Sequence, residues 1–179
     1  MKRAKVVAWL PLLSLLIALP LQATMIKRMD LEEMAQAAGL IFRGTVIEID
    51  KGSVTVGGRE IPTINYQIRV AEKLKGSFPA APGGETILTI RSVNVKALEL
   101  PRLAVGEEYL LLTTTPSALG LSTAVGLSQG VFRISGDGNN QLAVNALNNE
   151  GLAAEMKGPA RYGDLVERIR SSLRKGAPK

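Results

Sequence analysis

Short segments rich in β-branched and aliphatic residues recur along this chain, and turns that contain glycine or proline separate them. The clearest is 64–70, in which Ile64, Tyr66, Ile68 and Val70 alternate with polar residues. Because successive side chains of a strand point to opposite faces of a sheet, this alternation predicts a half-buried strand. Further strands are predicted at 40–50, 53–56, 86–91, 108–114, 131–134 and 141–144.

The spacing of the turns indicates how these strands are arranged. Turns are predicted at Lys51-Gly52 and Gly57-Gly58, and a hairpin turn at 136–140. The continuous apolar run 109–112 predicts a strand that is buried on both faces. Many short strands with turns about every 8–12 residues predict a small barrel or sandwich. A closed barrel is favoured because it leaves no exposed strand edges.

One helix is predicted on each side of the β region. Asp30 and Glu33 have the spacing of a capping box, and the helix they begin is expected to stop at a left-handed Gly39. A second, amphipathic helix is predicted over 164–175, with Leu165, Ile169 and Leu173 on its apolar face. The predicted class is therefore mainly β, with a short N-terminal helix and a C-terminal amphipathic helix.

The first 23 residues have the pattern of a cleavable signal peptide. Lys2, Arg3 and Lys5 precede the apolar stretch 6–19, and Ala23 supplies a small residue at the cleavage position. A membrane-spanning helix needs roughly 20 apolar residues, and this stretch is shorter. We therefore expect an exported protein, periplasmic or extracellular, made of a signal peptide (1–23), a β-domain (24–156) and a basic C-terminal helix or tail (157–179).

Basic residues are concentrated in the tail. Residues 157–179 contain seven basic and two acidic residues, whereas 24–156 contain twelve basic and fourteen acidic ones. The tail is expected to contribute more to weak contact with an anionic membrane or envelope polymer than to core stability. Aromatic residues make up only 4% of the chain, too few for base stacking, so no nucleic-acid partner is expected. The candidate contact residues are Arg168, Arg170, Arg174 and Lys175.

The chain contains no cysteine and no histidine. Disulfides, thiol chemistry and zinc sites built from cysteine or histidine are thereby excluded, as is acid–base catalysis by imidazole. A lipoprotein anchor also needs a cysteine, so the exported protein is not expected to be a lipoprotein. No metal or other cofactor of its own is predicted.

Several short motifs superficially suggest an enzyme. Residues 126–130 form a G-x-S-x-G sequence, but Ser128 has no histidine to activate it and a strand, not a helix, is predicted to follow. Ser172 and Lys175 have an S-x-x-K spacing at the end of an exposed helix, without a pocket. We therefore predict no catalytic residue. Solvated charges or a hairpin turn explain Glu32-Glu33, Glu107-Glu108 and Asp137.

The order of these segments resembles that of a known family. The stretch 40–46, the strand 66–70 with its following Lys75-Gly76 turn, and the stretch 106–111 are similar to netrin-like domains, which include the tissue inhibitors of metalloproteinases. The match covers roughly 30–115, about half of the chain. The pattern is also similar to a group of bacterial exported proteins that share the segment 126–132. The resemblance implies an OB-like five-stranded barrel with helices packed on it.

The resemblance also implies a function. In the animal inhibitors, a mature N-terminal cysteine chelates the zinc of the protease through its α-amine and carbonyl. Here Thr24 would occupy that position, with Met25 and Ile26 in adjacent apolar subsites, and no disulfide would hold the segment. We expect a non-enzymatic module that binds another exported protein, in the narrower case a zinc metalloprotease. The alternative is an envelope-associated structural or ligand-binding protein that uses the basic tail.

The leader gives the first testable prediction. Because the charged, apolar and small-residue regions occur in the required order, the exported protein should begin at or near Thr24. Intact-mass measurement of the exported fraction determines this directly. A mass that retains residues 2–23 in envelope-bound protein would contradict the prediction.

Overall fold

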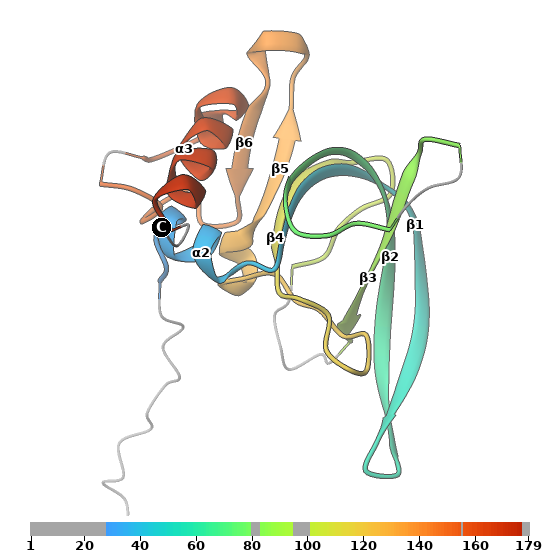
Figure 1. Cartoon of the computed structure of the whole chain (residues 1–179). Helices are drawn as coiled ribbons and strands as arrows, with labels where there is room; N and C mark the ends of the chain where they lie inside the picture. Colours follow the sequence, from blue (N-terminus) through green and yellow to red (C-terminus); the bar gives the residue numbers. More distant parts are fainter. Residues whose placement is uncertain (1–27, 80–82, 95–100, 155, 177–179) are drawn as a thin grey trace, which may run out of the picture.

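The computed structural model describes residues 28–79, 83–94, 101–154 and 156–176. Within them the chain forms one antiparallel sheet of seven strands and two α-helices, one near each end (Figure 1). The strand order is β3-β2-β1-β4-β5-β6-β7. The bounds are α2 Leu31–Ala37, β1 Leu40–Val56, β2 Arg59–Lys75, β3 Thr86–Val93, β4 Glu108–Thr113, the 3-10 turn η2 Leu127–Gly130, β5 Val131–Ser135, the 3-10 turn η3 Gly138–Asn140, β6 Leu142–Asn145, β7 Ala160–Arg161 and α3 Tyr162–Lys175.

The predicted mainly β class and both terminal helices are confirmed, whereas the strands form an open sheet with β3 and β7 at its edges. The loop after β4 bonds to β3, where the Ser122 amide donates to the Arg91 carbonyl at 2.8 Å. It also bonds back to β4, where the Val125 amide donates to the Leu112 carbonyl at 2.8 Å. The predicted signal peptide lies outside the described residues. No described helix has the length and hydropathy needed to cross a membrane.

The strands β1 and β2 form one long hairpin instead of the shorter strands predicted from sequence. Their pairing runs from Ile41–Lys75 to Val56–Arg59, with three register shifts. The predicted turn at Lys51-Gly52 is wrong, because Gly52 pairs with Thr63 within the ladder. The chain reverses only at Gly57-Gly58, where both φ angles are positive (57° and 76°), as a two-residue hairpin turn requires. The Lys51-Gly52 pair is compatible with a turn, but the pairing of its neighbours with β2 keeps it in an extended strand.

The capping box at the start of α2 is confirmed. The Asp30 carboxylate accepts from the Glu33 amide at 2.7 Å, and the Glu33 carboxylate accepts from the Asp30 amide at 3.2 Å. The helix is further tied to the segment after β6, because the Leu31 amide donates to the Leu152 carbonyl at 3.0 Å.

The end of α2 differs from the sequence prediction. Gly39 does not have the positive φ that was expected of it. Instead the Lys75 ammonium, at the end of β2, donates to the carbonyls of Ala35 and Gln36, each at 2.9 Å. These bonds satisfy carbonyls that the helix end leaves free, and a cation is favoured at that end of a helix. Desolvation in this position lowers the pKa of Lys75.

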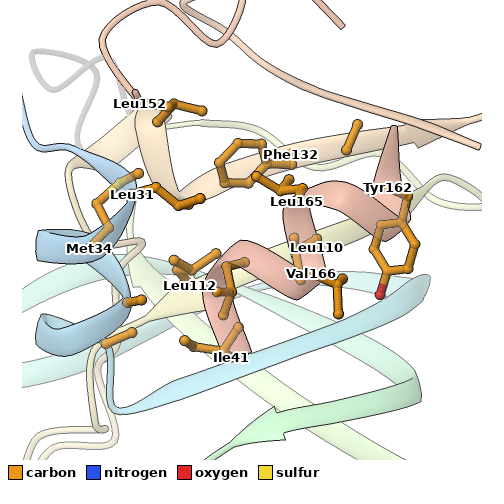
Figure 2. Packing of buried hydrophobic residues seen from close by; sticks show 14 of the residues in the cluster. Leu31, Met34, Ile41, Leu110, Leu112, Phe132, Leu152, Tyr162, Leu165 and Val166 are labelled. Carbon is orange, nitrogen blue, oxygen red and sulfur yellow. The ribbon is translucent and has the colours of Figure 1, made fainter. Parts of the chain in front are cut away.

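Two hydrophobic clusters lie on opposite faces of the sheet, and β4 contributes to both. Leu110 and Leu112 face the helices, and Tyr109 and Leu111 face the half formed by β1, β2 and β3. This confirms that β4 is buried on both faces, as the apolar run 109–112 predicts. Figure 2 shows the helix-side cluster, where side chains of α2 and α3 meet those of the sheet, including Leu31, Met34, Ile41, Phe132, Leu152, Tyr162, Leu165 and Val166.

The C-terminal helix α3 belongs to this core. The side chains of Leu165 and Ile169 are fully buried, and Tyr162 and Val166 nearly so. The expectation that the tail contributes little to core stability is therefore wrong: the apolar stripe that marks 164–175 as amphipathic packs on the sheet and on α2.

We expect Leu165→Ala to lower the free energy of unfolding by about 2–5 kcal/mol, because the deletion leaves a cavity in the helix-side core. Arg174→Ala, on the exposed side of the same helix, should change it by no more than about 0.5 kcal/mol. Chemical denaturation of both variants measures the difference. Equal, small effects would show that α3 is not part of the cooperative core.

Candidate functional site

The segment that contains Ser128 has a structural role. Ser128 lies in the 3-10 turn η2, and β5 follows it directly. The neighbouring Gln129 is buried: its side-chain oxygen accepts from the Met29 amide, and its carbonyl accepts from the Asn145 side chain, both at 3.0 Å. The segment thus holds the chain just before α2 against β6, and its glycines allow the tight path of the turn.

The paired carboxylates do not face one another. Glu107 forms an ion pair with Arg133, and Glu108 with Arg43. Glu33 belongs to the capping box, and Asp137 precedes the turn η3 within the β5–β6 hairpin. Among the described residues, no group of three or more acidic residues could hold a metal ion.

A polar network that joins α3 to the sheet centres on Arg43. Its guanidinium donates two hydrogen bonds to Glu108 (2.7 and 2.8 Å) and one to Gln141 (2.9 Å). It also lies over the ring of Tyr162, 4.7 Å from the centroid. Bidentate arginine–carboxylate pairs and cation–π contacts are among the stronger polar interactions in proteins. The hydrogen bond and charge of Glu108 raise the pKa of Arg43, which remains protonated.

The same network continues to α3 and β2. The Tyr162 hydroxyl donates to Glu72 at 2.5 Å, and Arg170 donates to the other oxygen of Glu72 at 2.7 Å. Two residues of α3, Tyr162 and Arg170, are therefore bonded to β2. Arg43 links the Tyr162 ring to β1 and, through Glu108, to β4. The network fixes the orientation of α3 on the sheet.

The four basic residues predicted to contact anionic surfaces do not form one free face. Arg170 is bonded to Glu72, and Lys175 lies 3.8 Å from Glu32. Arg168 and Arg174 are exposed and form no ion pair with the residues that the structure describes. The Ser172 hydroxyl, of the S-x-x-K motif, donates to the Arg168 carbonyl at 3.0 Å and is largely buried. The expectation that this motif lies without a pocket is wrong, because Ser172 and Lys175 line one.

The predicted partner-binding N-terminus, Thr24, Met25 and Ile26, lies outside the described residues. The first described residue is Arg28, whose guanidinium lies 3.9 Å from Glu150. The chain therefore enters the fold beside the loop that follows β6.

A feature that the sequence prediction missed is the tip of the β1–β2 hairpin, residues 53–62, which we call the arm (Figure 1). The strand β4 pairs with β1 only over 40–45, and β3 pairs with β2 only over 63–70. Within the described chain, residues 53–61 therefore pair only within the hairpin, and at the base of the arm the Pro62 carbonyl accepts from the Asn94 amide at 2.7 Å. The expectation of a turn at Lys51-Gly52 concealed the arm, although the alternation of Val54 and Val56 with polar residues was its signal.

One face of the arm is apolar. Val54 pairs with Ile61 and Val56 pairs with Arg59, and paired residues of antiparallel strands share a face. Val56 is 40% exposed, and Val54 and Ile61 are half-buried. The opposite face carries Ser53, Thr55, Glu60 and Pro62. The arm thus presents a short β-branched ladder, which we call the apolar ladder (Val54, Val56 and Ile61), and an open strand edge.

In comparisons with protein-family models and with curated proteins, the sequence matches none.

The network around Tyr162 predicts a dependence of stability on pH. Burial and the hydrogen bond to Glu72 raise the pKa of Tyr162 above its ordinary value near 10. Because the folded state holds this proton more tightly than the unfolded state, the stabilisation is complete below about pH 10 and is lost as the pH rises above that value.

We expect the free energy of unfolding to fall more steeply between about pH 10 and pH 12 in the wild type than in Tyr162→Phe. Burial also raises the pKa of Tyr66, which is present in both proteins and contributes equally to both curves. Denaturant titrations at each pH give the two slopes. Parallel curves would contradict the coupling of the Tyr162 proton to folding.

Proposed function

We propose that the protein is an exported, non-enzymatic module that binds another protein through the arm. The observation that carries this proposal is the apolar ladder, which lies on a projecting hairpin that no other described element covers. Exposed β-branched residues beside an open strand edge are a liability in a protein without a partner. An extended segment of another protein could pair with the edge while its side chains bury the ladder.

The rest of the structure agrees with a binding role. The Ser128 segment and the paired carboxylates are engaged in turns, caps and ion pairs within the fold, as described above. The arm is held at its base on the β2 side, where β3 pairs with β2 from Thr63 onward, while β4 pairs with β1 further back, over 40–45. A rigid base lowers the ordering cost of binding.

We also propose, from the netrin-like resemblance, an OB-like arrangement of β1 to β5. It is supported by the loop after β4, which bonds to β3 through Ser122 and to β4 through Val125. Inhibition of a zinc metalloprotease by the Thr24 amine is the narrower form of the proposed function. Contact of Arg168 and Arg174 with an anionic envelope surface is the alternative.

The arm proposal is tested with Val54→Thr/Val56→Thr/Ile61→Thr, which keeps β-branched side chains and removes the apolar surface. The matched control is Thr55→Ser/Glu60→Gln on the opposite face of the same arm. Wild type and control should retain one stoichiometric partner from the exported fraction, and the ladder variant should bind the purified partner at least about tenfold more weakly.

Equal binding by the ladder variant and the control would show that the arm is not the contact surface. In that case, comparison of the processed protein with a form carrying one extra residue before Thr24 tests the N-terminal alternative, because only a free Thr24 amine could chelate a protease zinc.

A further inference from the structure

A groove of about 560 Å³ lies between the start of α2, loop residues 151–154 and 156–157, and α3. The helices α2 and α3 lie far from the arm in Figure 1. Its accessible apolar surface comes mainly from Ala153, Ala154 and Met156, above Leu31 and Leu152, which are buried members of the helix-side core. The volume is in the usual range for small-molecule sites, roughly 300–1,000 Å³. Polar side chains line its rim. They are Asp30, which caps α2, Glu32 of α2, Lys157 of the loop, and Arg168, Ser171 and Lys175 of α3.

The acidic groups of this rim already have partners within the fold. Asp30 accepts the Glu33 amide at 2.7 Å as part of the capping box. Glu32 lies 3.8 Å from Lys175 across the groove. The rim carries three cations, Lys157, Arg168 and Lys175, against the two carboxylates of Asp30 and Glu32.

Two cations and a hydroxyl of the rim are not compensated. Arg168 and Lys157 form no ion pair, and the Ser171 hydroxyl no hydrogen bond, with any residue that the structure describes. Arg168, Ser171 and Lys175 are spaced i, i+3 and i+7, so they lie along one side of α3. The network of Arg43, Tyr162 and Glu72 fixes α3, and with it the position of Arg168 at the groove.

We propose that this groove binds a small ligand in which a carboxylate is attached to an apolar group. The planar guanidinium of Arg168 suits a carboxylate, with Lys157 as a second charge and Ser171 as a hydrogen-bond donor. The apolar group lies along Ala153 and Met156. This site is separate from the arm and adds a small-molecule ligand to the proposed protein partner.

Two kinds of ligand carry a carboxylate attached to an apolar group. One is a free aliphatic carboxylate, and the other is a peptide whose last residue is apolar. The probes are octanoate and an acetylated tripeptide ending in leucine. Octanol and the amide of the same tripeptide are their uncharged counterparts. Calorimetry on the purified protein, in the form that accumulates in the cell, measures each affinity.

One carboxylate probe should bind measurably, its uncharged counterpart should bind at least about tenfold more weakly, and added salt should weaken the binding. Which carboxylate binds more tightly identifies the source. Absence of binding by both carboxylates at millimolar concentration, or equal binding by octanol and octanoate, would overturn the proposal.

Arg168→Gln should weaken binding at least about tenfold, whereas Arg174→Gln should change it less than about twofold. Arg174 is the matched control because it is an exposed, unpaired arginine on the same helix and does not line the groove. Equal loss in both variants would indicate non-specific attraction and overturn the site. The arm variant Val54→Thr/Val56→Thr/Ile61→Thr should bind the carboxylate normally, so failure of either proposal is seen independently.

Discussion

The side chain of Arg43 lies where β1, β4 and α3 meet, and it connects the two layers of the molecule. Its charge is matched by Glu108, and the Tyr162 ring covers it at 4.7 Å. The Arg43 side chain is only 19% exposed, and its charge would be costly to bury without these partners. The position of Arg43 therefore depends on Glu108 and Tyr162. Since Tyr162 begins α3, the arrangement determines where that helix crosses the sheet and which of its residues reach the groove.

The strand β4 provides the apolar counterpart of this polar network. Its alternate side chains enter two clusters, one under the helices and one within the half formed by β1, β2 and β3. The clusters therefore share a central strand, and the sheet can extend away from it in both directions. This support at the centre allows the distal part of the β1–β2 hairpin to project as the arm, although that part buries little apolar surface of its own.

The two proposed contact surfaces belong to different halves of the fold and differ in chemistry. The arm carries the apolar ladder beside an open strand edge, suited to an extended protein segment. The groove combines a rim of three basic and two acidic side chains with apolar surface from the loop after β6, including Met156. Because no described element links them directly, a protein partner at the arm and a small anion at the groove would not compete for the same residues.

The sequence by itself determined the mainly β class, the capping box at Asp30, the double burial of 109–112 and the apolar stripe of α3. Each depends on local spacing, and side-chain periodicity is set by the backbone of the strand or helix. The tertiary structure decided what local spacing leaves open. Whether Lys51-Gly52 turns depends on the pairing of Gly52 with Thr63, and the end of α2 depends on Lys75, some forty residues away in the chain. The arm and the groove likewise arise only when distant segments pack together, because an open edge or a hollow is defined by which neighbours reach it.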